Sequence, residues 1–224
     1  MKLLYATAFR APNAFELDYN DGGNTQIASE YLQPEELETI ELVFEYYFNR
    51  RLRAELNLFH TDIADILSLA TVDDELLQIQ NKGDVETWGA EIQLEGKWDN
   101  GLKGRISYAW QETESKETGE RLTNSPEHLV KLNLIAPLWT DKLFAGVETQ
   151  YMSGRKTASG GQVGDHVITN LTLLTQNWAK GLDLSAGVYN LFDEEYFDPG
   201  SEEHTQNGIE QDGVTFRVKA SLEF

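Results

Sequence analysis

The chain has 224 residues, a formal net charge of -20, no cysteine, 40% hydrophobic residues and a mean hydropathy of -0.46. No apolar run approaches the roughly 18 residues that a membrane-spanning helix requires, which excludes a helical membrane protein. The lack of cysteine excludes a disulfide framework and a thiolate metal site, and the strong negative charge argues against nucleic acid as a partner.

Ten runs with the composition of β-strands follow one another along the chain. Several alternate apolar and polar residues, the period of two that gives a strand one apolar and one polar face. The runs span residues 2–9, 38–48, 51–70, 77–98, 102–113, 129–138, 142–153, 166–176, 182–192 and 214–224.

The last run, 214–224, alternates without an exception. Its apolar members are Val214, Phe216, Val218, Ala220, Leu222 and Phe224. Arg217 and Lys219 lie between them, and either charge would cost about 2–4 kcal/mol on a lipid-facing surface near the bilayer midplane. We therefore predict a membrane barrel strand whose polar face lines a hydrated lumen, with its register strongly specified.

Earlier runs repeat this pattern. Apolar residues share one face of run 38–48 and of segments 52–58 and 88–98. The opposite faces carry the charged residues Glu41, Glu45, Arg53, Glu55, Glu91, Glu95 and Lys97. Repeated charges on the inner face suit a wet interior rather than a dry core. The sequence thus predicts an all-β fold, an antiparallel transmembrane β-barrel sheet of about ten strands.

The connections between the runs alternate strictly between long and short. In chain order they span 10–37, 49–50, 71–76, 99–101, 114–128, 139–141, 154–165, 177–181 and 193–213. Outer-membrane barrels have short periplasmic turns and longer outer loops. The long loops are rich in Gly, Asn, Asp and Glu, as in 18–24, 73–75, 112–120 and 202–204. We interpret their negative charge as a solvated surface rather than as a cation-binding collar.

Aromatic residues collect at the strand ends. Beside the short turns or at the carboxyl terminus are Phe48, Trp98, Trp139, Trp178 and Phe224. Near the opposite strand ends are Tyr108, Trp110, Tyr151 and Phe192. Aromatic belts of this kind mark the two membrane interfaces of a barrel. The alternative is that these are ordinary core aromatics of a soluble β protein.

Six stretches, in this order, resemble the carboxy-terminal half of the barrel of TonB-dependent outer-membrane receptors. They are Phe9-Arg10-Ala11-Pro12, Leu32-Gln33-Pro34-Glu35 leading into Thr39-Ile40-Glu41-Leu42, Trp88-Gly89-Ala90-Glu91, Ser125-Pro126-Glu127-His128, the segment from Tyr189-Asn190-Leu191-Phe192 to Tyr196, and the terminal strand from Gly213 to Phe224. Each stretch is a weak signal alone, whereas together they cover the whole chain.

The resemblance implies energy-coupled uptake of a scarce nutrient of the ferric siderophore, haem or cobalamin class across the outer membrane of a Gram-negative bacterium. Such receptors have about 22 strands and a plugged lumen. We therefore expect residues 1–224 to form the carboxy-terminal portion of a receptor barrel. The plug domain, the amino-terminal strands and the segment that contacts the TonB complex would lie outside this chain, as would any export signal.

The partners expected on this basis are outer-membrane lipid, the remaining strands, the plug and a metal-chelate ligand, with the TonB complex reached only through the missing part. A passive outer-membrane porin and a non-transporting barrel fragment are the alternatives. An outer-membrane enzyme and an adhesive barrel are further rivals.

Two sets of candidate site residues follow. For ligand binding by the outer loops we select the aromatic residues Phe15, Tyr19, Tyr31, Tyr196 and Phe197. For a lumen face that meets the plug through charge pairs and water we select Arg105, Lys131, Glu148, Arg217 and Lys219.

Catalysis, metal ligation and a bound cofactor are not expected. The four histidines, at positions 60, 128, 166 and 204, are far apart in the sequence, and neither a G-x-S-x-G nor an H-E-x-x-H motif occurs. We interpret His128 and His166 as interfacial or loop residues rather than as ligands.

Overall fold

The computed structural model describes residues 1–29, 31–72, 76–139, 142–201 and 204–223. Contacts divide the chain into two compact units, and each is described by itself. The first unit comprises Met1–Leu42, Leu58–Gly89 and Glu112–Leu122. The second unit comprises Val43–Asn57, Ala90–Gln111 and Thr123–Phe224. In the described part of the chain, no helix is long and apolar enough to cross a membrane.

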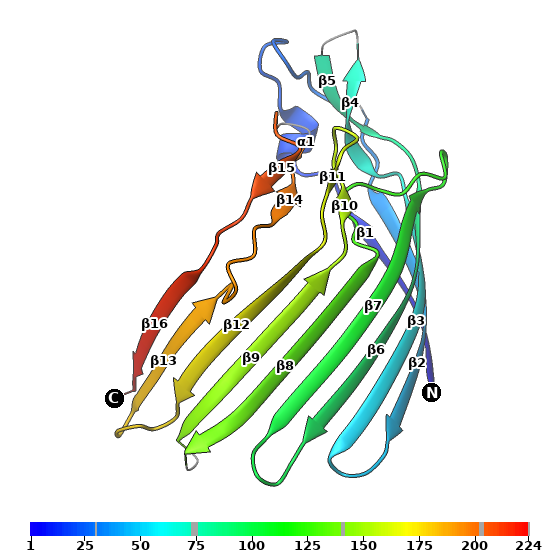
Figure 1. The fold of residues 1–224 in the computed structure, drawn as a ribbon. Coiled ribbons are helices and arrows are strands. Elements are labelled where there is room, and N and C mark those ends of the chain that lie inside the picture. The colour runs from blue at the N-terminus through cyan, green and yellow to red at the C-terminus, as the bar shows by residue number, and fades with distance from the viewer. Residues whose placement is uncertain (30, 73–75, 140–141, 202–203, 224) are drawn as a thin grey trace. The chain divides into compact units, whose positions relative to one another are not determined.

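The main structure is an antiparallel sheet of 10 strands in the order β1-β2-β3-β6-β7-β8-β9-β12-β13-β16. Figure 1 shows the last five of these strands side by side. The bounds are β1 (Lys2–Arg10), β2 (Glu35–Tyr47), β3 (Leu52–Ala64), β6 (Val85–Lys97), β7 (Lys103–Ser115), β8 (His128–Trp139), β9 (Leu143–Met152), β12 (His166–Thr175), β13 (Leu182–Tyr189) and β16 (Thr215–Leu222). The predicted all-β, antiparallel fold of about ten strands is confirmed.

Three predicted runs were too long. Run 51–70 is interrupted at Asp65, whose φ of 56° ends β3, and run 77–98 is interrupted at Gly83, whose φ is 85°. Between these two breaks the chain forms a separate hairpin of β4 (Leu67–Val72) and β5 (Leu76–Asn81). Run 182–192 ends at Tyr189, because Asn190 takes a φ of 49° and its side chain bonds both the amide and the carbonyl of Glu194. Apolar residues resume soon after each break, at Ile66, Val85 and Leu191, so the apolar content of the sequence did not reveal where each strand ends.

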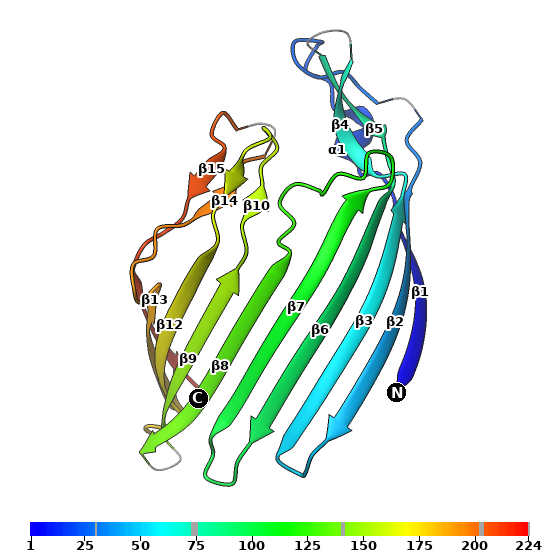
Figure 2. The same cartoon turned by 45° about the vertical axis from the view of Figure 1, so that its right-hand side comes forward.

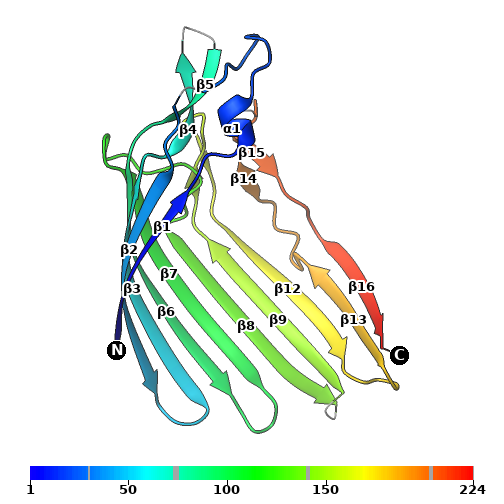
Figure 3. The ribbon, with the colours of Figure 1, turned by 180° about the vertical axis from the view of Figure 1, so that it is seen from behind.

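The long connections contain short elements that periodicity did not predict. The first unit adds helix α1 (Ala14–Asp18) and the β4–β5 hairpin, and the loop after α1 joins the hairpin through a Gln26–Leu77 bridge (Figure 3). The second unit adds two small pairs beyond the ends of β9 and β12 (Figure 2). These are β10 (Arg155–Lys156) with β11 (Gln162–Val163), and β14 (Phe197–Pro199) with β15 (Gly208–Glu210).

Strand register in the second unit aligns apolar residues across five neighbouring strands. Residues paired across antiparallel strands project to the same side of the sheet. Two rows run from β16 to β8: Phe216, Val188, Leu171, Val147 and Leu134, and Val218, Ala186, Leu173, Ala145 and Ala136. We call this surface the apolar face. Phe216 and Val218 are 77% and 80% exposed on it, which is how lipid-facing side chains lie.

Very few apolar residues are buried. In the described ranges they are Ala70, Ile79, Val85 and Val163, which lie in the hairpins of the long connections or at the first residue of β6. A soluble β protein would bury one face of its sheet instead of leaving an extended apolar surface open. The burial pattern therefore favours a membrane sheet over a soluble β core.

The predicted alternation of connections holds along the sheet with one correction. Short turns lie between β2 and β3, β6 and β7, and β12 and β13, and all belong to the second unit. The predicted short connection 139–141 includes residues 140–141, which lie outside the described residues. The predicted long connection 71–76 was wrong, because β4 and β5 pair there and the long connection from β3 to β6 spans residues 65–84. Figure 1 shows the turns after β2, β6 and β12 at the ends of their strands opposite the long connections. We call these two ends of the strands the turn end and the loop end.

Gly89, in the first unit, lies beneath an aromatic ring. A Cβ atom at this position would lie 2.2 Å from the Cζ atom of Phe59. Aromatic cover of a strand glycine is a known device for stabilising a sheet. We expect Gly89→Val to displace the ring and to lower the free energy of unfolding by about 1–3 kcal/mol.

Urea unfolding in lipid vesicles measures this change. Gly164→Val is a matched control, because no atom lies within 4 Å of a Cβ at Gly164 and its backbone is outside the left-handed region that favours glycine. Equal stability of Gly89→Val and the wild type would contradict the expectation.

Candidate ligand-binding and lumen-facing surfaces

The side of the second unit opposite the apolar face is polar, and we call it the polar face. One row across it contains Arg105, Asn133, Glu148 and Asn170, and the next contains Ser107, Lys131, Gln150 and Ile168. A surface with charges and carboxamides in successive rows is suited to contact with water or with a polar protein surface rather than with lipid.

All five residues predicted to face a plug lie on this polar face. Arg105, Lys131 and Glu148 are members of the two rows above. Arg217 and Lys219 follow in β16, where they pair with Gly187 and Ser185 of β13. The Arg217 guanidinium lies 5.1 Å from the centre of the Tyr189 ring, which orients its charge along the face. That these residues meet a plug stays a prediction.

Near the turn end, Arg53 organises a group of charges. Its guanidinium donates a 3.1 Å hydrogen bond to Glu95 and lies 3.6 Å from Glu55 and 3.9 Å from Glu45. The Lys97 ammonium lies 2.8 Å from Glu95. These side chains are a quarter to two-thirds exposed, so water screens the pairs and their effect on stability is small. The group keeps this part of the polar face hydrated and close to electrically neutral.

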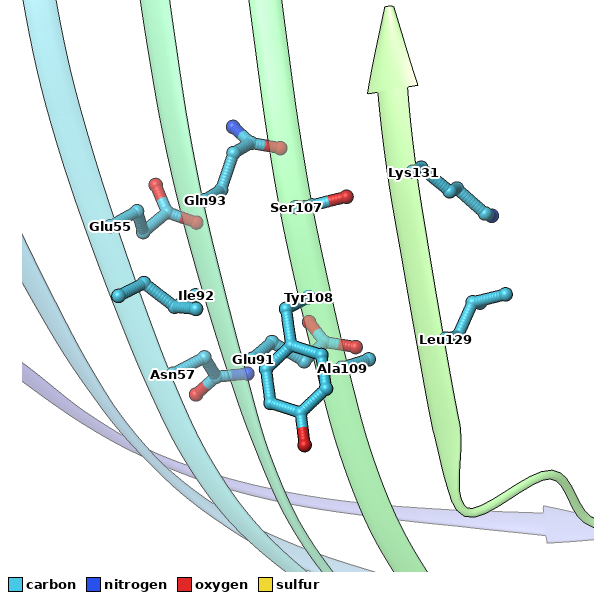
Figure 4. A pocket seen from close by; sticks show the side chains of 10 residues that line it. All are labelled: Glu55, Asn57, Glu91, Ile92, Gln93, Ser107, Tyr108, Ala109, Leu129 and Lys131. Atoms are coloured by element: carbon cyan, nitrogen blue, oxygen red, sulfur yellow. The ribbon is translucent and has the colours of Figure 1, made fainter. Parts of the chain in front are cut away.

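A pocket of about 170 Å3 lies farther along the same strands (Figure 4). Its lining includes the carboxylates of Glu55 and Glu91, the amide of Gln93 and the ammonium of Lys131. The lining residues belong to β3, β6, β7 and β8, and Figure 4 shows their side chains on these strands. With both signs of charge and several hydrogen-bonding groups, the pocket suits ordered water or polar side chains of a partner.

A second pocket, of about 320 Å3, lies at the loop end of β9 and β12. The imidazole of His166, a residue only 5% exposed, packs at a tilt of 38° against the Tyr196 ring, with ring centres 4.6 Å apart. Glu148, Asn170 and Asp198 add a carboxylate, an amide and a second carboxylate to the lining. Burial, with Asp198 and Asp212 nearby, raises the pKa of the Tyr196 hydroxyl, which therefore stays a hydrogen-bond donor at neutral pH.

Arg155 holds in place the segment 196–198, which contributes Tyr196 and Asp198 to the lining of this pocket. The residue is 6% exposed, and its guanidinium donates to Asp198 Oδ1 at 2.7 Å, to the Phe197 carbonyl at 3.2 Å and to Asn124 Oδ1 at 3.0 Å. Three long connections thus meet at one buried cation. Phe197, predicted as a ligand residue, contributes to this arrangement through its main chain, while Tyr196 presents its side chain to the pocket.

The other predicted loop aromatics belong to the first unit. Phe15 and Tyr19 stack with ring centres 4.4 Å apart, one on helix α1 and the other at its C-cap. A capping box between Asn13 and Glu16 fixes the start of this short helix. Tyr31 is 91% exposed. The structure thus brings together Phe15 with Tyr19, while Tyr31 extends into solvent.

The predicted membrane-interface aromatics lie at the turn end. Phe48 and Trp98 directly follow β2 and β6, Trp139 is the last residue of β8, and Trp178 lies in the turn after β12. They are 55%, 41%, 67% and 47% exposed in that order, as expected of rings at a lipid-water boundary. Phe224 lies outside the described residues.

Sequence reasoning missed Arg155 and assigned His166 only to an interface or loop. Arg155 follows Ser153 and Gly154 in a polar loop, and its partner Asp198 is 43 residues away. No periodic pattern links such positions. One feature of the sequence did point to His166. It follows Asp165 at the first position of the predicted run 166–176, and this position places its imidazole at the loop end of the strand.

The histidines are spread over both units. His128 forms a hydrogen bond with the Tyr108 hydroxyl at 3.0 Å, His204 forms one with Ser201 Oγ at 2.6 Å, and His60 packs at a tilt against Trp88.

Several solved structures are similar to this chain. The ferric-catecholate import receptor Fiu from E. coli matches with a TM-score of 0.72 and 22% identity over 99% of this chain and 32% of its own. A mutant of the ferric enterobactin receptor PfeA from Pseudomonas aeruginosa matches with a TM-score of 0.78 and 22% identity, over 99% of this chain and 38% of its own. The ferric yersiniabactin uptake receptor FyuA from Yersinia pestis matches with a TM-score of 0.74 and 16% identity, over 99% of this chain and 34% of its own.

These likenesses concern the fold. The chain spans about a third of the length of the solved structures it matches. A search of curated proteins gives no match. Residues 3–191 match the family described as TonB dependent receptor-like, beta-barrel. The chain therefore belongs to the TonB-dependent receptor β-barrel family, whose members are outer-membrane transporters of Gram-negative bacteria and not enzymes.

Proposed function

We propose that this chain forms part of the barrel wall of an outer-membrane receptor that takes up a scarce metal chelate with energy from the TonB complex. The observation that carries the proposal is the pairing of an apolar face with a polar face across the same strands, in a chain of this family. The apolar face suits lipid, and the polar face suits a hydrated lumen that holds a plug.

Such a barrel needs further strands and a plug in addition to residues 1–224. β1 and β16 end the order of the described sheet, so each has one hydrogen-bonded neighbour in it. Unpaired N–H and C=O groups in lipid cost several kcal/mol each, so both edges require partner strands. The matched structures, about three times as long as this chain, offer room for those strands. The polar-face residues from Arg105 to Lys219 would then face the plug.

The ligand class that we propose is a ferric siderophore, haem or cobalamin type of metal chelate. The three relatives named above are receptors for ferric catecholate, ferric enterobactin and ferric yersiniabactin. Ferric siderophores are therefore the first ligands to assay. The alternatives are a passive porin and a barrel fragment that does not transport.

Uptake by cells tests the transport proposal. Cells that depend on this protein are given radiolabelled ferric siderophores, with and without a functional TonB complex. We expect uptake that disappears when the TonB complex is removed. Uptake that persists without the complex, together with ion conductance of the purified protein in planar bilayers, would support the porin instead. Absence of uptake for every metal chelate offered would support the non-transporting fragment.

The predicted ligand-binding aromatics provide a separate test. Since aromatic side chains often dominate binding energy, we expect Phe15→Ala, Tyr31→Ala and Tyr196→Ala each to raise the Kd of the transported chelate about five- to tenfold. Equilibrium binding to the protein in outer-membrane vesicles measures this change. Tyr46→Ala, at the turn end of β2, is the matched control. Unchanged affinity in all three loop variants would remove these residues from the binding site.

A further inference from the structure

Three side chains with metal-ligand chemistry meet in the first unit. His60 and Asp62 lie two residues apart on β3, and Glu86 lies on the neighbouring strand β6. One ligand atom from each residue falls within 4.8 Å of the other two. Sequence spacing did not reveal this group, because Glu86 is far from the other two along the chain.

The imidazole of His60 is held between the two carboxylates. Its Nδ1 atom lies 3.6 Å from Asp62 Oδ2, and its Nε2 atom lies 3.7 Å from Glu86 Oε2. The Nε2 atom is screened from solvent and has no hydrogen-bond partner in the structure. The indole of Trp88 packs against the imidazole at a tilt of 34°, with ring centres 3.9 Å apart, and restricts its rotation. A buried nitrogen without a partner is costly unless a ligand satisfies it.

The charges around His60 favour a cation. The Lys116 ammonium forms an ion pair with Asp62, and its backbone amide donates to the Asp84 carbonyl. The hydrogen bond to Asp62, with Glu86 and Asp84 nearby, raises the pKa of Lys116. Three carboxylates therefore surround one ammonium group, which leaves an excess of two negative charges. Lys116 offsets part of this excess and would compete with a bound metal ion.

The group lies where an apolar stripe ends. Leu56 and Leu58 precede His60 and Asp62 at the same two-residue period on β3, and Leu58 is 41% exposed. Trp88 is 54% exposed on the strand that carries Glu86. This transition from leucine to a ring and then to carboxylates is typical of the boundary between lipid and water. Attraction between the carboxylates and a cation is stronger beside hydrocarbon than in bulk water.

We propose that His60, Asp62 and Glu86 form a binding site for a divalent transition-metal ion of the Zn2+ type at the loop-end boundary of the membrane. One imidazole nitrogen with two carboxylate oxygens is a ligand set that Zn2+ accepts, and the nitrogen disfavours Mg2+ and Ca2+. Ligands of a tetrahedral Zn2+ lie roughly 3.4 Å apart, so the Asp62 and Glu86 carboxylates would move toward the same imidazole nitrogen when the ion binds. The site is independent of the transported chelate.

Zn2+ titration calorimetry tests the site, using protein purified from outer membranes and treated with chelator. We expect saturable Zn2+ binding, with Mg2+ binding at least about tenfold weaker. His60→Gln and Glu86→Gln should each weaken Zn2+ binding by at least roughly 10- to 100-fold, because each removes a ligand and losing only a ligand's hydrogen-bond partner already costs that much. His128→Gln is the matched control, since it removes a histidine that belongs to the second unit and bonds Tyr108.

A variant that binds Zn2+ more tightly than the wild type shows that weaker binding in the other variants does not come from misfolding. Lys116→Met removes the competing ammonium and should tighten Zn2+ binding about two- to fivefold, the scale of an exposed ion pair. A misfolded protein could not show this gain. Zn2+ binding that is equal in the wild type and His60→Gln, or that is lost equally in His128→Gln, would overturn the proposal.

Discussion

Leu134→Arg is expected to lower the free energy of unfolding by about 2–4 kcal/mol. Leu134 lies in the middle of β8, in a row of the apolar face with Val147 and Leu171, and is 39% exposed. A guanidinium at that depth must stay in hydrocarbon or deform the bilayer to reach water. Urea unfolding of the protein refolded into lipid vesicles measures the loss.

Asn133→Arg is the matched control for this prediction. Asn133 is the preceding residue of β8 and lies on the polar face, beside Glu148. The same charge at the same depth should then change the free energy of unfolding by less than about 1 kcal/mol. Equal losses from Leu134→Arg and Asn133→Arg would show that the two faces do not differ in environment, contrary to the assignment of lipid and lumen.

Arg155→Met is the second large expected effect, with a loss of about 2–3 kcal/mol in the free energy of unfolding. Removing the guanidinium leaves Asn124, the Phe197 carbonyl and Asp198 without their donors. Because the Asp198 side chain is 49% exposed, water can solvate its carboxylate again, which keeps the loss below that of a fully buried ion pair. We also expect faster proteolysis of the segment that contains β14 and β15.

Lys156→Met controls for the loss of a charge at this place, because Lys156 follows Arg155 in β10 and is exposed. It should leave both thermal stability and the protease pattern unchanged. If Arg155→Met were as stable and as protease-resistant as Lys156→Met, the buried guanidinium would not anchor the loops as described.

The strands of the sheet were predictable because membrane strands alternate strictly. In β16 every second residue is apolar, and a slip of one position would move Arg217 and Lys219 into lipid. The prediction failed where further apolar residues, Ile66, Leu67 and Leu69, follow β3 without a gap in the apolar composition. There the positive φ of Asp65 starts a new hairpin, a conformation that side-chain periodicity does not record.

The candidate sites were predictable only in part. Charge alternation placed Arg105 and Glu148 on one face, which the strand register confirms. The pocket at the loop end depends on pairs such as Arg155 with Asp198, which are far apart along the chain and are brought together by the packing of long loops. Long polar loops of this kind carry no repeating sequence pattern.

A spin-label scan along residues 129–136 of β8 is the sharpest test of the assignment of one face to lipid and the other to a hydrated lumen. The natural chain contains no cysteine, so each single-cysteine variant labels one position. In lipid vesicles, we expect labels at 130, 132, 134 and 136 to be accessible to oxygen, and labels at 129, 131, 133 and 135 to be accessible to a water-soluble nickel complex. This period of two would confirm the assignment. Uniform accessibility to the nickel complex along the whole segment, or the opposite phase, would contradict it.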